Sequence, residues 1–171
     1  MIRRSQLLAV AVALTVVASM TNSAERPATT GGHPDFSGEW VLDLGRSHLD
    51  NHFQTISSGE VSIEHREPAF SFLRTFVDKT GSSTVSFMLY TDGKEVAGTE
   101  DGMPTRQILT WSGETLVFLT IYQSPRGEAR NTVRYSLADD GKTLRAEESF
   151  HGPRLTYENV WVFTKRQRSV A

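Results

Sequence analysis

Residues 105–121, Thr-Arg-Gln-Ile-Leu-Thr-Trp-Ser-Gly-Glu-Thr-Leu-Val-Phe-Leu-Thr-Ile, contain the pattern that decides the fold. Two runs rich in Thr, Ile, Val, Phe and Trp flank Ser112-Gly113, and these residue types are enriched in β-strands. A glycine between two such runs supplies the positive φ that a tight hairpin turn needs. The stretch therefore predicts two antiparallel strands that are neighbours in space.

The same arrangement recurs along the chain, where Asp92-Gly93 and Asp140-Gly141 mark two further hairpin turns. Turn signals fall about every 8 to 12 residues, a spacing typical of a β-sandwich or β-barrel. No long helical pattern interrupts the runs, so nothing supports the crossover that parallel strands require. We expect ten strands, at residues 38–43, 60–65, 69–77, 82–91, 94–100, 105–111, 114–121, 128–137, 143–150 and 155–164.

These strands form either two stacked sheets or one sheet closed on itself, and closure removes the exposed edges that promote aggregation. We therefore expect an all-β fold, a single antiparallel up-and-down β-barrel of about 8–10 strands over residues 34–166. A barrel of this size has room for side chains or for one small ligand. Residues 167–171 form a tail.

One segment departs from the β pattern. Ser47 can cap a short helix near residues 47–53, with Asp50 three residues later, and Leu49 and Phe53 then lie on one face. Such a helix would cross one mouth of the barrel. The alternative is an irregular surface loop.

Residues 1–24 have the profile of a signal peptide. Arg3 and Arg4 precede the apolar run 7–18, and small polar residues follow up to Ala24. A membrane anchor is the competing interpretation, but 12 apolar residues fall short of the roughly 20 that span a bilayer as a helix. The cleavage site lies after Ala18 or after Ala24; with cleavage after Ala24, residues 25–33 form a flexible lead-in. The sequence thus predicts a periplasmic or secreted protein.

Charge and cysteine content limit the kinds of partner and of membrane attachment that the sequence allows. Without residues 1–24 the formal net charge falls from −2 to −4, which argues against a nucleic-acid partner. The chain has no cysteine, so disulfides and a lipid-modified cysteine are both excluded. We expect no stable membrane anchor, and the sequence identifies no protein partner.

The first strand opens with Phe36-Ser37-Gly38-Glu39-Trp40, whose Gly-x-Trp motif resembles the one that begins the first strand of lipocalins and related calycins. In those families the tryptophan closes one barrel end, and an Arg or Lys from the last strand lies over its ring. The resemblance implies this place for Trp40, next to Gly38, with Lys165 or Arg166 as the cation.

A closer resemblance is to small, uncharacterised bacterial exported proteins described as lipocalin-like, and it covers residues 34–166. Besides the first strand, it is carried by residues 62–65, 91–94, 111–116 and 136–144. The Thr-Asp-Tyr type of second lipocalin motif is missing, and the disulfides of secreted lipocalins cannot form. The resemblance implies a fold and leaves the ligand open, because a fold alone does not define a function.

Alternation along the strands predicts which side chains face the interior, because successive residues of a strand point to opposite sides. The inward aromatic faces either fill the core or line a ligand pocket. Two charged residues share these faces. Arg74 and Glu148 either pair with each other, or Arg74 receives a ligand carboxylate, or a strand bulge turns them outward. The ligand-binding candidates are Phe72, Arg74, Phe87, Phe118, Tyr135, Glu148, Tyr157 and Trp161.

A weak metal-binding candidate is His48-x-Asp50-x-His52, whose three side chains would converge on one side of an extended segment. The alternative is that these three residues are ordinary solvated polar residues of a surface loop. The sequence has no Gly-x-Ser-x-Gly, no His-Glu-x-x-His and no glycine-rich phosphate loop, so it indicates neither a catalytic site nor a cofactor.

The leading hypothesis is an exported binding module whose barrel takes a small apolar or amphipathic molecule. The alternative is a non-enzymatic interaction, inhibitor or envelope protein that acts through loops such as 47–58 or 123–128 around a filled core. An exposed apolar patch beside those loops would favour it. An enzyme of unknown type is a third hypothesis, because perturbed polar groups inside a barrel can be catalytic without any short motif.

Overall fold

The structure is a computed structural model that describes residues 32–100 and 102–167. The expected signal peptide and all but the last two residues of the lead-in lie outside the described residues. The strands are β1 (Gly38–Leu42), β2 (Ser58–Arg66), β3 (Ala69–Asp78), β4 (Gly81–Tyr90), β5 (Asp92–Glu100), β6 (Met103–Ser112), β7 (Thr115–Ser124), β8 (Gly127–Ala138), β9 (Thr143–His151) and β10 (Thr156–Lys165).

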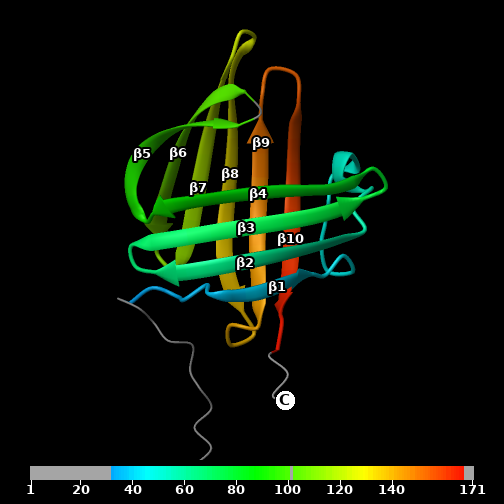
Figure 1. The fold of residues 1–171 in the computed structure, drawn as a ribbon, viewed down its shortest axis with the longest axis vertical. Helices are drawn as coiled ribbons and strands as arrows, with labels where there is room; N and C mark the ends of the chain where they lie inside the picture. The colour runs from blue at the N-terminus through cyan, green and yellow to red at the C-terminus, as the bar shows by residue number, and fades with distance from the viewer. Residues whose placement is uncertain (1–31, 101, 168–171) are drawn as a thin grey trace, which may run out of the picture.

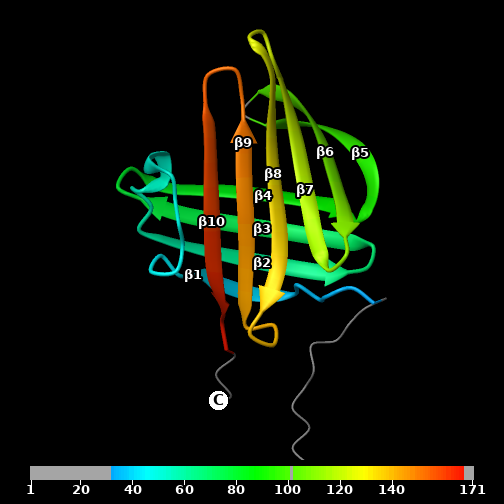
Figure 2. The same ribbon diagram turned by 180° about the vertical axis from the view of Figure 1, so that it is seen from behind.

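The ten strands form one antiparallel sheet in the order β4-β3-β2-β1-β10-β9-β8-β7-β6-β5. Each strand pairs with its neighbours in sequence except β4 and β5, which are the two edges of the sheet, and β1 pairs with β10, which joins the first strand of the chain to the last. The hairpin predicted at Asp92-Gly93 is therefore wrong: Asp92 pairs with Thr110 of β6, and the register shifts after it. β1 to β4 run across β6 to β10, so the two halves enclose an interior (Figures 1 and 2). The predicted all-β, up-and-down barrel of ten strands is confirmed.

The hairpin between β6 and β7 shows how local sequence produces this order. Ser112 pairs with Thr115, and Gly113 between them has φ +62°, a conformation that most side chains disfavour. From this turn the register continues without interruption to Thr105 opposite Tyr122. Several strands extend beyond the predicted limits: β2, for example, begins at Ser58, because its pairing with β3 continues to Val77.

Trp40 closes one end of the barrel, as the lipocalin resemblance implies. It is fully buried, and its Nε1 donates a hydrogen bond to the carbonyl of Phe36 at 3.1 Å. Lys165 Nζ lies 5.1 Å from the centre of the Trp40 ring. Gly38 is needed beside it, because a Cβ there would lie 2.7 Å from Lys165 Cε. Arg166 does not take this place; its guanidinium pairs with Glu60.

The segment after β1 differs from the predicted helix. It contains one 3-10 turn, η1 (Asn51–Phe53), and Asp50 rather than Ser47 caps it, by accepting a hydrogen bond from the backbone of His52. The reason is that His48 forms a β-bridge with Val160, which extends the backbone before the turn. Ser47 meanwhile donates to the carbonyl of Asp43 at 2.7 Å.

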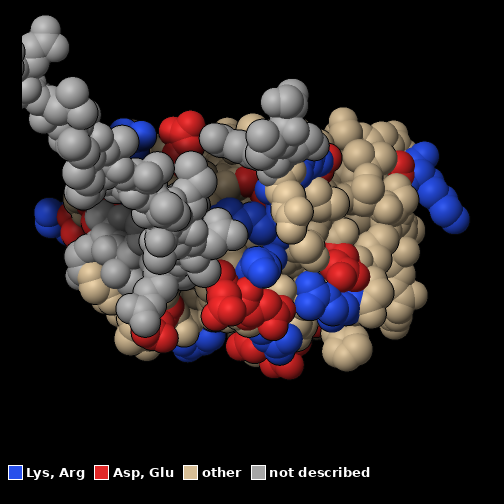
Figure 3. All heavy atoms as spheres, turned by 90° about the horizontal axis from the view of Figure 1, so that it is seen from below, with Lys and Arg blue, Asp and Glu red and all other residues tan. Residues whose placement is uncertain are grey.

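Acidic and basic side chains are interspersed on the lower end of the barrel (Figure 3). Within residues 32–100 and 102–167, no helix has the length and apolar character that a membrane span needs.

Candidate functional site: the barrel cavity

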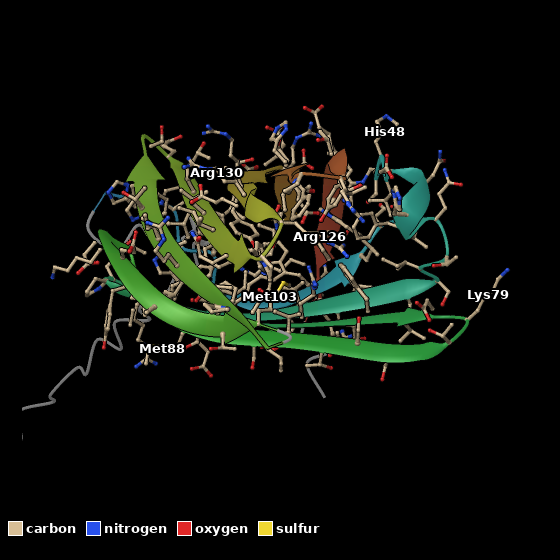
Figure 4. All side chains as sticks on the ribbon, turned by 90° about the horizontal axis from the view of Figure 1, so that it is seen from above. His48, Lys79, Met88, Met103, Arg126 and Arg130 are labelled. Carbon is tan, nitrogen blue, oxygen red and sulfur yellow. The ribbon has the colours of Figure 1, made fainter. Side chains whose placement is uncertain are left out.

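A cavity of about 240 Å³ lies inside the barrel, towards the end at which η1 lies. Figure 4 looks into this end, where many side chains converge between β3 and β4 on one side and β7 to β10 on the other. The cavity is lined by Phe53, Phe72, Arg74, Val85, Ser86, Phe87, Thr99, Glu100, Gln107, Phe118, Thr120, Tyr122, Asn131, Val133, Tyr135, Glu148 and Tyr157.

A second void of about 30 Å³ lies next to the first and shares Phe72, Arg74, Tyr135 and Glu148 with it. Trp161 lines this smaller void. The structure thus brings all eight predicted ligand-binding candidates together around two adjacent interior spaces. Seven of them line the larger cavity, and Trp161 lines the smaller one.

Aromatic rings form one wall of the cavity. The rings of Phe72 and Phe87 are stacked with centroids 4.9 Å apart, and Phe87 lies 4.5 Å from Phe118. On the opposite side, Phe53 of η1 packs edge-on against Tyr157 at 4.9 Å. These rings face an interior that they do not fill, so they are available to contact an apolar surface.

Glu148 is the central polar group, and its residue is 8% exposed. Its Oε1 accepts a hydrogen bond from Asn131 Nδ2 at 3.0 Å. Its Oε2 accepts from Asn159 Nδ2 at 2.9 Å and from Trp161 Nε1 at 2.8 Å. Three neutral donors therefore hold this carboxyl group in one orientation, which lowers the cost of burying it.

Arg74 faces the same cavity from β3, and no ion pair joins it to Glu148 in the described part of the chain. Its guanidinium lies 4.5 Å from the Phe76 ring, and its buried Nε has no hydrogen-bond partner among the described residues. No bulge turns it outward, because Arg74 pairs regularly with Val61 and Val85. Of the alternatives raised by the sequence, the pairing and the bulge are wrong.

Three tyrosines add hydroxyl groups to the interior. Burial, together with the nearby charge of Glu100 and the hydrogen bond to it at 2.9 Å, raises the pKa of Tyr122. Burial likewise raises the pKa of Tyr135 and of Tyr157, with Glu148 adding to the effect. All three side chains therefore stay neutral at physiological pH and can donate hydrogen bonds.

The sequence reasoning missed several polar residues of the cavity, chiefly Glu100, Gln107, Thr120, Tyr122 and Asn131. A signal for the last three was present. Thr120 and Tyr122 alternate in phase with the inward Phe118, and Asn131 alternates in phase with the inward Tyr135. Gln107 likewise alternates in phase with the buried Leu109, whereas Glu100, at the end of the exposed strand β5, carried no comparable signal.

The weak metal-binding candidate does not form a convergent set. His52 Nδ1 lies 2.5 Å from Asp50 Oδ1, while His48 is engaged in the bridge to β10. Elsewhere in the described residues there is also no group of three His, Cys, Asp or Glu side chains arranged to hold a metal ion.

A second buried polar cluster, centred on Glu67, lies at the closed end of the barrel and was not predicted. Glu67 Oε1 accepts hydrogen bonds from His65 Nε2 at 3.0 Å and from Trp111 Nε1 at 2.7 Å. Its Oε2 accepts from the hydroxyl of Thr91. The cluster ties β2 and β6 to the connection between β4 and β5, so we assign it a structural role.

Exposed apolar side chains gather elsewhere. Leu73, Met88 and Tyr90 lie on the outer face of β3 and β4, and Met88 points away from the barrel in Figure 4. This face is not part of either loop, 47–58 or 123–128, on which the interaction hypothesis depends.

No protein-family model matches the sequence, and no curated protein matches it. Solved structures do resemble it. Zebrafish ileal bile acid-binding protein with cholic acid is 14% identical, covering 77% of this chain and 98% of that one, at TM-score 0.53. A Schistosoma mansoni fatty acid binding protein with arachidonic acid is 14% identical (77% and 96%, TM-score 0.53), and human cRBP IV is 17% identical (77% and 98%, TM-score 0.51). The fold is therefore lipocalin-like, of the calycin type.

Proposed function

We propose that this protein is an exported carrier that binds one small amphipathic molecule inside its barrel. The observation that carries the proposal is the interior cavity of about 240 Å³, which combines an aromatic wall with Arg74 on one side and Glu148 on the other. Small-molecule sites are concave and combine apolar and aromatic walls with fixed polar groups. Polar residues are at least as numerous as apolar ones in this lining, which suits an amphipathic ligand. Ligand-bound neighbours with the same fold are consistent with this use.

Two polar atoms of the lining residues lack a partner. Asn131 Oδ1 and Arg74 Nε are both buried without a hydrogen-bond partner among the described residues, and both residues line the cavity. Each unsatisfied buried group costs about 1–3 kcal/mol. Both atoms lie beneath the cavity surface, so a ligand reaches them only where these side chains move.

Native mass spectrometry of the full chain, expressed with its own N-terminus and purified under gentle conditions, tests both parts of the proposal. We expect a chain shortened by a segment ending near residue 24 and carrying one small adduct that solvent extraction removes. A chain of full length would contradict export with cleavage. A bare mass in repeated preparations would contradict the carrier function.

A cavity-filling variant tests whether the small adduct is bound inside the barrel. Thr120 is buried and lines the cavity, so Thr120→Phe places a ring in the space and should abolish the adduct. Thr84→Phe is the matched control, because Thr84 is exposed on β4 and pairs with Thr75 on the outer face. An adduct that persists in Thr120→Phe would place the ligand outside the barrel.

A further inference from the structure

The two edge strands of the sheet border the cavity without pairing. β4 and β5 are the ends of the strand order, so no backbone pairing joins them in the described sheet. The chain connects them at Thr91, and from there β5 turns away from β4 (Figure 1). Residues 85–87 of β4 and residues 99–100 of β5 all line the cavity. Along the line between these strands, the seam, side chains alone therefore separate the cavity from solvent.

Phe87 is the side chain that spans the seam from β4. Its ring centroid lies 4.5 Å from that of Phe118 on β7 and 4.9 Å from that of Phe72 on β3. Phe87 is partly buried, and it lines both the cavity and a groove on the outer face of β3 and β4. Rotation of a side chain is much faster than the opening of paired strands. Movement of this ring therefore connects the cavity with the outer groove while the β-ladder stays intact.

The outer groove leads to this ring over apolar surface. Leu73 and Met88 line the groove and are 45% and 59% exposed, and Tyr90, further along β4, is 50% exposed. β4 itself contains no charged residue. An amphipathic molecule can therefore adsorb here and reach Phe87 without removing water from a charged group of β4, which would be costly.

The end of the barrel covered by η1 is tied more firmly. His48 and Val160 exchange two backbone hydrogen bonds, at 2.8 and 2.7 Å. The backbone of Asp50 donates to Asn159 Oδ1 at 2.8 Å, and Phe53 packs edge-on against two aromatic rings of β10. Opening this end requires several hydrogen bonds to break together, whereas opening the seam requires none between strands.

We infer that the ligand enters and leaves the barrel through the seam, past Phe87, and not beneath η1. This inference rests on the proposed carrier function and names the route to the same site. It also gives a role to the exposed apolar side chains of β3 and β4, which form the surface that the ligand crosses first.

The cysteine-free sequence allows the route to be measured without knowing the ligand. Val133 on β8 lines the cavity, and Val133→Cys introduces the only thiol of the chain. The rate at which iodoacetamide alkylates this thiol, followed by mass spectrometry, reports how fast a small molecule reaches the cavity. The rate is measured at several urea concentrations, because access through global unfolding rises with urea. The urea-independent part is compared between variants.

Phe87→Ala in this background should speed alkylation about tenfold or more, because opening the seam no longer breaks its two ring contacts. Phe53→Ala is the matched control, since it removes the same ring from the end covered by η1, and it should leave the rate nearly unchanged. Thr99→Trp is a second test that spares the core, because Thr99 is exposed on β5 and borders the seam. The larger side chain should slow alkylation.

A larger acceleration by Phe53→Ala, equal acceleration by both alanine variants, or acceleration by neither would overturn the inference. An unchanged rate in Thr99→Trp would also overturn it. These outcomes leave the carrier function standing, because the adduct and its loss in Thr120→Phe test that function separately. A bare mass in native mass spectrometry would reject the carrier function whatever route iodoacetamide takes.

Discussion

Glu67 shows how one side chain can hold together residues that are distant in sequence. Burial opposes ionisation of its carboxyl group, but hydrogen bonds from Thr91, His65 and Trp111 outweigh burial and hold the pKa of Glu67 below its ordinary value of 4.5. His65 donates through Nε2, because its Nδ1 accepts a hydrogen bond from the backbone of Phe36. The carboxylate form is therefore the one that the fold selects.

Replacing Glu67 by Gln should lower the free energy of unfolding by about 1–2 kcal/mol at pH 7, because charge-assisted hydrogen bonds are lost. A group whose pKa is lower in the folded state stabilises above its unfolded pKa, near 4.5, and loses this contribution as the pH falls through its folded pKa. The difference between the wild type and Glu67→Gln should therefore shrink in acid. Urea unfolding between pH 3 and pH 7 measures it.

Glu64→Gln provides the control, since Glu64 is exposed on the outer face of the neighbouring strand. It should change stability little at any pH in this range. A deficit of Glu67→Gln that stays constant from pH 7 to pH 3 would show that the charge of Glu67 contributes nothing.

At the scale of elements, the close packing of β2 against β3 depends on a residue without a side chain. Gly59 faces the interior, where a Cβ would lie 2.5 Å from Cδ1 of Phe76 and 3.2 Å from Cβ of Leu42. Phe76 cannot easily yield, because its ring stacks on Trp161 at 4.8 Å and also carries the Arg74 guanidinium. Gly59 thus leaves room for the Phe76 ring at the place where it contacts both Trp161 and Arg74.

We predict that Gly59→Ala destabilises the protein by about 1–3 kcal/mol through overpacking. Gly45→Ala is the control, because a Cβ at Gly45 meets only Asp43 Oδ1, at 3.4 Å. Thermal unfolding of both variants measures the difference. Equal stability of the two variants would show that Phe76 has room to move.

The strands also illustrate what local sequence can predict. Their number, their inward faces and most of their pairings follow from turn residues and from a two-residue alternation, both of which act over a few residues. Asp92-Gly93 is the exception, because β4 and β5 do not pair. Of the two alternatives for residues 47–53, a short helix or an irregular loop, the structure has a loop with a single 3-10 turn, for a non-local reason. Its backbone pairs with β10 at Val160, more than a hundred residues away, and no local pattern reports such pairing.

For the whole molecule, the barrel has one weak seam, the line along which its edge strands β4 and β5 meet without pairing. β4 and β5 are the two ends of the strand order, and each is hydrogen-bonded along one side only within the described sheet. β5 is exposed along nearly its entire length, on both faces. At its beginning the seam is held by the contacts of Glu67 with Thr91 and Trp111.

Hydrogen exchange should therefore be markedly uneven. Local stability follows buried contacts and protected hydrogen bonds, so amides of β5 that bond to β6 should exchange at least about tenfold faster than amides of β8. β8 is paired on both sides, with β7 and β9, and makes the natural internal reference. Equal protection in the two strands would show that the barrel opens only as a unit.

The sequence by itself determined the all-β class, the antiparallel pairing of most neighbouring strands, the inward aromatic faces and a place for a cation, Lys165 or Arg166, over Trp40. Each of these follows from residues near one another along the chain or from a family motif. The tertiary structure alone decided the size of the cavity, the separation of Arg74 from Glu148 and the Glu67 cluster. These depend on the distances between side chains from strands far apart in sequence, which only the curvature and closure of the whole barrel establish.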